Sequence, residues 1–166
     1  MPTIPKVLTV DLDDTLWDVS AVIGRAERKL GEWLAQHYPR VVEHFDTAAI
    51  TALRQQVVAD HPERSHDFPF LRLRVLRLML AGSGHDPAAA ADAYAVFDGW
   101  RNTVTLFDDA LPALERLAAR FKLIALTNGS ADVGRIGLGH VFSDSVTAVR
   151  AGAPKPQRAI FDYVVG

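Results

Sequence analysis

The chain of 166 residues contains no cysteine, so disulfide bonds, thiolate catalysis and cysteine-ligated metals are excluded. It also has no run of about 18 consecutive apolar residues, the length that a membrane-spanning helix needs. Its start, MPTIPKVLTVDLDD, reaches acidic residues before the apolar segment of a secretion signal could develop. We therefore expect a cytoplasmic protein with no membrane partner.

Positive charge is also scarce. The chain has 18 Lys and Arg against 20 Asp and Glu, a formal net charge of −2, and its basic residues are dispersed. Binding to a phosphate backbone needs clustered Lys and Arg, so we expect no nucleic-acid partner. The six histidines show no metal-ligand spacing such as HExxH. With 49% hydrophobic residues, the chain can form one core, or one core and a small second unit.

Short apolar segments predict the strands of a parallel sheet. KVLTV at 6–10 is followed directly by Asp11, KLIALT at 122–127 ends in Thr127, and SVTAV at 145–149 is a third candidate. Between the first two strands, four segments show helical periodicity: residues 19–38, 47–60, 67–80 and 86–100. A further helix is predicted at residues 110–120 and leads into the second strand.

The sequence thus predicts an α/β fold with a Rossmann-like parallel sheet core and an inserted helical module. We assign residues 1–16 and 105–166 to the core and residues 17–104 to the helical module. The insertion is too long for an ordinary crossover between neighbouring parallel strands.

Two carboxylates follow the first predicted strand. Asp11 and Asp13 are two residues apart, so both can project from the carboxyl edge of the sheet, where ligands bind in open α/β folds. Such a pair can share a divalent cation, and Mg²⁺ suits their hard oxygen ligands. One carboxylate could attack as a nucleophile while the other transfers the proton of the leaving group.

Three further residues complete the predicted site. Thr127 ends the second strand, and the TNGS segment offers its hydroxyl, the Asn128 amide and backbone N–H groups that could hold an anion. Asn128 could equally serve only the turn, because Asn-Gly is itself a turn signal. Lys155 lies between two prolines and could act as a point charge for phosphate. Together these residues predict a site for a metal-bound phosphoryl group.

Three segments carry a resemblance to a known family. VDLDDTLWD, LIALTNG and GAPKPQRAIF resemble the first three motifs of the haloacid dehalogenase superfamily, in order and spacing. The helical insertion is similar to that family's small cap domain. Segments such as GWRNTV and LTNGSADVGRIGLGHVF are further similar to the flavin mononucleotide phosphatase-like members.

The resemblance implies a role for each site residue. Asp11 would be the nucleophile that forms an aspartyl-phosphate, and Asp13 would be general acid and then general base. Thr127 and Asn128 would bind the phosphoryl group, and Lys155 would neutralise developing charge. Mg²⁺ would be held by the Asp11 carboxylate and by Asp13 through its backbone carbonyl.

The implied function is a Mg²⁺-dependent phosphatase acting on a small phosphorylated metabolite, such as flavin mononucleotide, a nucleotide or a sugar phosphate. An alternative is a 2-haloacid dehalogenase, which Asp13 disfavours because dehalogenating members lack an acid at that position. A second alternative is a catalytically inactive, truncated interaction module that forms a homodimer.

One part of the family pattern is missing. The sequence ends at FDYVVG, before the acidic pair of a fourth motif that completes the Mg²⁺ shell. We expect the sequence to be a fragment of a longer chain, rather than a natural truncation completed by a partner. Without the next strand, the strand of the nucleophile would be an exposed edge, which favours association.

Overall fold

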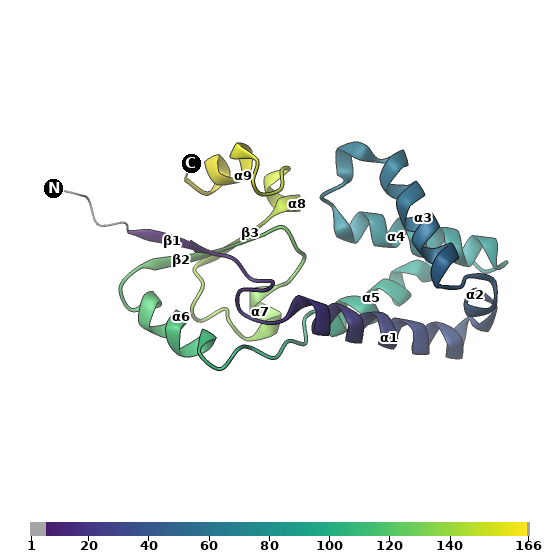
Figure 1. Cartoon of the computed structure of the whole chain (residues 1–166), viewed down its shortest axis with the longest axis horizontal. Helices are drawn as coiled ribbons and strands as arrows, with labels where there is room; N and C mark the ends of the chain where they lie inside the picture. Colours follow the sequence, from purple (N-terminus) through teal and green to yellow (C-terminus); the bar gives the residue numbers. More distant parts are fainter. Residues whose placement is uncertain (1–5, 166) are drawn as a thin grey trace. The chain divides into compact units, whose positions relative to one another are not determined.

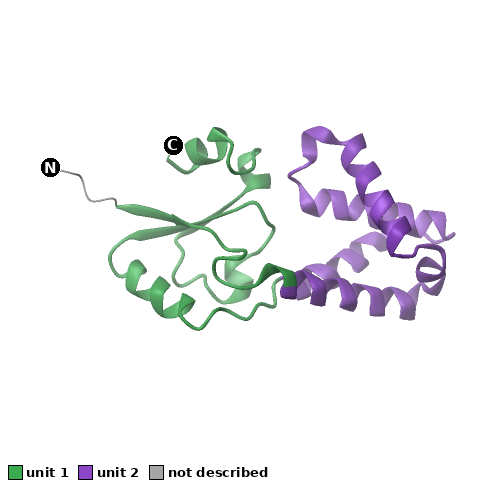
Figure 2. Ribbon diagram, in the orientation of Figure 1, with its two compact units in different colours: residues 1–20, 102–166 green, residues 21–101 purple. Residues whose placement is uncertain are grey.

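A computed structural model describes residues 6–165, which divide into two compact units. The sheet unit comprises residues 1–20 and 102–166, and the helical unit comprises residues 21–101 (Figure 2). Our predicted division, at residues 16/17 and 104/105, lies a few residues from these bounds. That the helical unit acts as a cap stays a prediction.

The sheet unit is built on parallel strands. Within residues 6–165 the sheet has the order β1 (Val7–Val10), β2 (Lys122–Thr127) and β3 (Asp144–Thr147) (Figure 1). Both pairings are parallel, with Val10 beside Ala125 and Thr127 beside Thr147. The carboxyl ends of all three strands therefore lie at one edge of the sheet, as the motif positions predicted.

Position in the sheet sets the burial of each strand. Residues 123–127 of the central strand β2 are all buried, which explains its uninterrupted apolar sequence. By contrast, β1 pairs on one side only within the described chain, and Val7 is 42% exposed. The prediction that β1 is an edge strand is confirmed for these residues. That this edge favours self-association stays a prediction.

Helices of the sheet unit lie on both sides of the sheet. Figure 1 shows α6 (Ala110–Ala118) and α7 (Val133–Ile136) on the side opposite to α8 (Ala148–Ala151) and α9 (Arg158–Val165). Ile160 of α9 is fully buried and packs with Ile124, Leu126 and Val146 of the sheet. This apolar layer fixes α9 over the β2–β3 half of the sheet.

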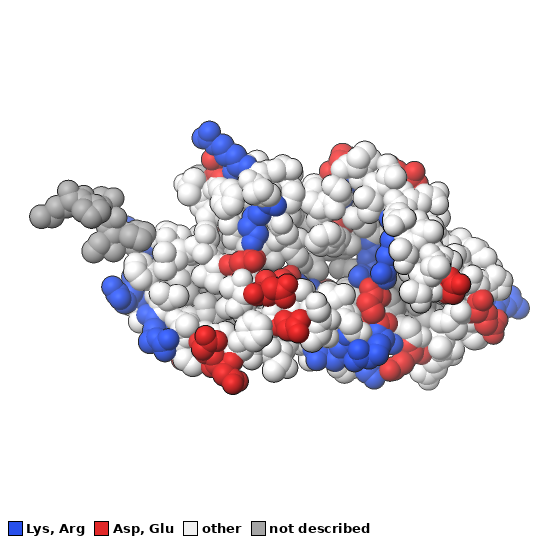
Figure 3. Space-filling view, viewed as in Figure 1, with Lys and Arg blue, Asp and Glu red and all other residues white. Residues whose placement is uncertain are grey.

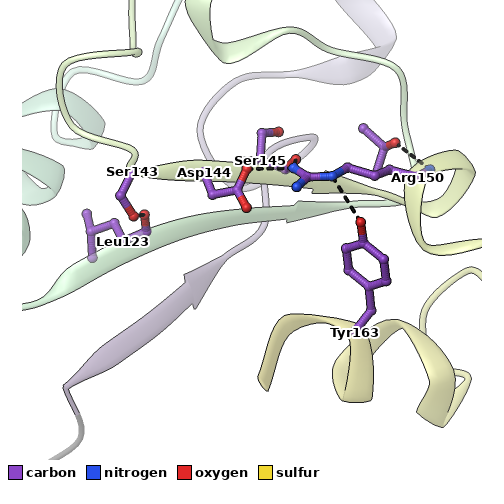
Figure 4. Close-up of polar contacts among 7 residues, drawn as sticks. Leu123, Ser143, Asp144, Ser145, Arg150 and Tyr163 are labelled. Atoms are coloured by element: carbon purple, nitrogen blue, oxygen red, sulfur yellow. Dashed lines mark hydrogen bonds and ion pairs between the residues drawn. The ribbon is translucent and has the colours of Figure 1, made fainter. Parts of the chain in front are cut away.

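An ion pair joins β3, α8 and α9. The guanidinium of Arg150 donates to Asp144 Oδ1 at 2.5 Å and to the carbonyl of Ser145 at 2.7 Å, and its Nε donates to the Tyr163 hydroxyl at 3.3 Å (Figure 4). The hydrogen bond from Arg150 lowers the pKa of the Asp144 carboxyl. The third strand is shorter than predicted, because Thr147 caps α8 by accepting from Arg150 N at 3.1 Å.

The helical unit packs its helices around a separate apolar core. This core includes Leu30 and Leu34 of α1, Val75 and Leu80 of α4, and Phe97 of α5. The elements that contribute to this unit are α1 (Val19–His37), α2 (Pro39–His44), α3 (Thr47–Asp60), η1 (Pro62–Arg64), α4 (Phe68–Gly82), η2 (Pro87–Ala89) and α5 (Ala90–Arg101).

A partly buried ion pair also stabilises the helical unit. Arg72 donates to Glu27 Oε1 at 2.8 Å, and its guanidinium lies 3.4 Å from the centre of the Phe97 ring. Arg54 donates to the same oxygen at 2.9 Å. Burial lowers the pKa of Arg72, and Glu27 partly opposes this shift. Arg72 therefore has partners inside the helical unit.

The surface carries charges of both signs. Figure 3 shows Lys and Arg side chains interspersed with Asp and Glu on the face that it draws, in keeping with the formal net charge of −2. Within residues 6–165, no helix combines the length and the apolar character needed to cross a membrane.

Candidate active site

The structure brings Asp11 and Lys155 into direct contact. Asp11 is the first residue after β1, and Lys155 Nζ donates to its Oδ1 at 2.6 Å across 144 positions of sequence. The Lys155 side chain is 23% exposed and that of Asp11 is 43% exposed. The predicted nucleophile and the predicted phosphate-binding cation therefore form a partly buried ion pair that solvent can still reach.

A tight loop follows Asp11. Leu12 is fully buried, and its carbonyl accepts from Leu16 N at 2.8 Å. Asp14 has a left-handed backbone with φ 57°, a conformation that Asp tolerates better than most residues. Its carboxylate accepts from Val19 N at 3.0 Å, at the start of α1. Asp14 thus supports the loop, in agreement with the preference of Asp for turns.

The side chain of Asp13 has a partner within this loop. Trp17 Nε1 donates to Asp13 Oδ1 at 2.9 Å, and Trp17 is fully buried. An isolated bridge also pairs the backbones of the two residues. This contact was not predicted from the sequence, although an indole four residues after an acidic side chain in a short loop is a usable signal, since a buried indole N–H needs an acceptor.

Thr127 ends β2 next to this loop in the sheet order. It is 1% exposed, and its hydroxyl oxygen accepts from Gly129 N at 2.9 Å. The hydroxyl hydrogen still allows Thr127 to donate to an anion. This bond also stabilises the bend at Asn128 and Gly129, where the Asn-Gly sequence is a turn signal.

Both ends of the Asn128 amide contact the backbone of Lys155. Asn128 Nδ2 donates to the Lys155 carbonyl at 3.0 Å, and Lys155 N donates to Asn128 Oδ1 at 2.7 Å. The Lys155 ammonium additionally donates to the carbonyl of Leu126 at 2.8 Å. Asn128 in the loop after β2 therefore holds the Lys155 backbone, and Leu126 within β2 binds its side chain. Phosphate binding by Asn128 itself stays a prediction.

The donor set agrees with the predicted metal only in part. Asp11 offers a carboxylate oxygen and Asp13 a backbone carbonyl oxygen, both of them hard ligands that suit Mg²⁺, and Mg²⁺ commonly takes one or two protein carboxylates together with water and substrate phosphate. Within residues 6–165, no group of three or more His, Asp or Glu side chains is placed to hold a metal ion. These residues therefore suit a Mg²⁺ site that draws its other ligands from elsewhere.

The comparison with known families agrees with this arrangement. The family model of the haloacid dehalogenase-like hydrolases matches residues 5–165. The chain belongs to this family. This haloacid dehalogenase-like hydrolase thus has the fold and family that its three motifs predicted, and its paired aspartates, threonine and lysine lie in the part of the chain that the family model covers.

Individual relatives carry two different descriptions. The chain is 33% identical, over 155 residues, to 5-amino-6-(5-phospho-D-ribitylamino)uracil phosphatase YigB of Escherichia coli strain K12. The match covers 91% of this chain and 65% of that protein, so the chain spans just under two thirds of this curated relative. The crystal structure of a 2-haloacid dehalogenase from Pseudomonas syringae pv. Tomato DC3000 is 35% identical, with a TM-score of 0.91, over 98% of this chain and 72% of that one.

A third relative supports the fold alone. It is the magnesium-bound structure of the HAD-hydrolase YfnB from Bacillus subtilis, which is 23% identical with a TM-score of 0.63, over 98% of this chain and 73% of that chain. Because the first two relatives are described by different reactions at nearly equal identity, identity does not choose between the reactions. The chemistry of the site has to make that choice.

Proposed function

We propose that this haloacid dehalogenase-like hydrolase is a phosphatase that cleaves the phosphomonoester of a small metabolite through an aspartyl-phosphate at Asp11. The observation that supports this most is the Asp11–Lys155 ion pair at 2.6 Å, beside a second acid at Asp13. A carboxylate nucleophile and a phosphate both carry negative charge, so they repel each other unless a cation lies between or beside them. Lys155 supplies that charge.

The reaction would proceed in two balanced steps. Asp11 attacks phosphorus, the ester P–O bond breaks, and Asp13 gives its proton to the departing alkoxide. Water then attacks the phosphorus of the acyl phosphate, the bond to Asp11 breaks, and Asp13 takes a proton from that water. The Thr127 hydroxyl would donate to a phosphoryl oxygen in both steps.

Mg²⁺ is the proposed cofactor. The resemblance assigns it to the Asp11 carboxylate and the Asp13 backbone carbonyl, and its chemistry would be to polarise the phosphoryl oxygens and reduce their charge. We expect a chelator to abolish turnover of a phosphate ester and added Mg²⁺ to restore it. Turnover that is unchanged by chelation would contradict this assignment.

Dehalogenation is the competing function, because one relative is described as a 2-haloacid dehalogenase. A halide ion leaves as a weak base and needs no proton, whereas an alkoxide does. Asp13 therefore has a task in ester cleavage and none in halide departure. Chloride release from a 2-chloroacid by the purified protein, without phosphate release from any ester, would reverse our choice.

The substrate is proposed from the relatives and the resemblance. Candidates are 5-amino-6-(5-phospho-D-ribitylamino)uracil, which the YigB name specifies, flavin mononucleotide, other nucleotides and sugar phosphates. Phosphate release should be measured with each of them, for the protein and for its Asp11→Asn variant, which cannot form the intermediate. Near-unchanged release by Asp11→Asn would refute the phosphatase proposal, and a dimer without activity on any ester would favour the interaction module.

A further inference from the structure

The buried indole of Trp17 lies against the candidate acid. Its Nε1 donates to Asp13 Oδ1 at 2.9 Å, and no part of Trp17 is exposed. We propose that Trp17 is a positioning residue, which fixes the orientation of the Asp13 carboxyl. This inference rests on the proposed phosphatase function and assigns Trp17 a part in that reaction beyond packing.

The backbone around Trp17 is fixed at several points. Asp14 N donates to the Trp17 carbonyl at 2.9 Å, and Phe107 N donates to the Leu16 carbonyl at 2.9 Å. Because the ring is enclosed and the backbone is hydrogen-bonded at Leu16 and at Trp17, the position of the indole N–H is fixed. An acceptor that meets this donor is therefore held in one orientation, and Asp13 supplies the acceptor.

The type of donor makes the contact independent of the charge of the carboxyl. An indole nitrogen only donates, so Asp13 Oδ1 acts as the acceptor whether the carboxyl is charged or neutral. Trp17 would therefore hold the Asp13 carboxyl in the same orientation in both steps of the proposed reaction.

If Trp17 had only a packing role, a different result would be predicted. Phenylalanine keeps an aromatic ring at position 17 but has no N–H group, so Trp17→Phe removes the donor and retains most of the buried apolar area. If Trp17 only fills the core, this change should affect all substrates alike. If Trp17 positions the acid, the change should affect only the substrates that need an acid.

Esters of two kinds separate these outcomes. The departure of 4-nitrophenolate needs little help from an acid, whereas the alkoxide of an alkyl phosphate such as glycerol 1-phosphate depends on one. We expect Trp17→Phe to lower kcat/KM for the alkyl ester by about 10-fold, a part of the roughly 10²–10⁴-fold that general acids contribute, and to change it less than about twofold for the nitrophenyl ester. Equal losses on both esters would overturn the inference.

The chain offers a matched control and a double variant. Trp100→Phe makes the same chemical change in the helical unit, where the Trp100 ring lies 5.6 Å from Lys29 Nζ, and it should leave both esters unaffected. In an Asp13→Asn background, adding Trp17→Phe should cause no further loss on the alkyl ester. A further loss of about 10-fold in that background would show that Trp17 does not act through Asp13.

A second readout does not depend on turnover. The chain has three tryptophans, and their indole N–H resonances can be assigned with Trp17→Phe and the corresponding variants of Trp33 and Trp100. We expect Asp13→Ala to shift the Trp17 resonance and to leave the other two in place. An unmoved Trp17 resonance would overturn the inference. If Asp13→Ala shifts the Trp17 resonance but the wild-type protein cleaves no ester, the phosphatase function is refuted, whereas the contact between Trp17 and Asp13 is confirmed.

Discussion

Replacement of Asn128 by alanine tests how the loop after β2 contributes to the site. The wild-type amide makes two hydrogen bonds to the Lys155 backbone, at 3.0 and 2.7 Å. Each such bond has a net value of about 0.5–1.5 kcal/mol, so losing both removes about 1–3 kcal/mol of local order, or roughly 5- to 150-fold in the population of the correct arrangement. Lys155 also keeps its own bonds to Asp11 and Leu126. We therefore expect the lower part of this range.

The assay is kcat/KM for phosphate release from the best ester found, where Asn128→Ala should be about 10-fold below the wild type. The matched variant Asn128→Asp keeps an acceptor for Lys155 N and loses the donor to the Lys155 carbonyl. The double variant Asn128→Ala with Lys155→Ala then identifies the route. If Asn128 acts through Lys155, the double variant is no slower than Lys155→Ala alone; if Asn128 binds phosphate directly, the two losses multiply. Wild-type activity in Asn128→Ala would refute both the role of Asn128 through Lys155 and its direct binding of phosphate.

Three further predictions concern stability. Because Arg150 lowers the pKa of folded Asp144, this carboxylate contributes stability at pH values above its unfolded pKa of about 3.9, and the contribution disappears as the pH falls through the folded value. The Tm difference between the wild type and Asp144→Asn should therefore be small at pH 7, since the side chain is 41% exposed, and should vanish once the pH lies below the folded value; a difference that grows in acid would contradict the assignment. Ile160→Ala should cost about 2–5 kcal/mol in urea unfolding, because this residue is fully buried against the sheet; a loss below about 1 kcal/mol would refute its place in the core. Arg72→Met should cost about 1.5–3 kcal/mol by the same measurement, because a charged hydrogen bond to Glu27 is lost, and an unchanged midpoint would refute that.

The sequence predicted the strands better where they are fully buried. The bounds of β2 at residues 122–127 were predicted correctly, because a continuous apolar run ending in a polar residue matches a central parallel strand. The third strand was placed at 145–149 but spans Asp144–Thr147. Its apolar run continues into α8, and such a run does not show where a strand ends and a helix begins. Thr147 as a helix-capping residue was the missed signal.

For the site, residue types could be predicted but partners could not. Spacing after β1 was enough to place Asp11 at the carboxyl edge of the sheet, and Lys155 was assigned to the same site by its charge and its flanking prolines; the structure joins the two side chains. The contacts of Asn128 with Lys155 depend on the path of a loop 27 residues further along the chain, which no local pattern specifies. The Trp17 contact depends on the left-handed backbone at Asp14, which turns the loop back on itself.

The contact between Trp17 and Asp13 helps to choose between the two reactions described for the relatives. An acidic residue at position 13 could persist in a dehalogenase as a harmless side chain, so its presence alone argues only weakly for ester cleavage. A buried donor aimed at Oδ1 of that carboxyl is a stronger argument, because a positioned acid serves a leaving group that has to be protonated as it departs. An alkoxide has this requirement and a halide does not. The loop around Trp17 therefore favours a phosphate ester as the substrate, independently of which relative is more similar.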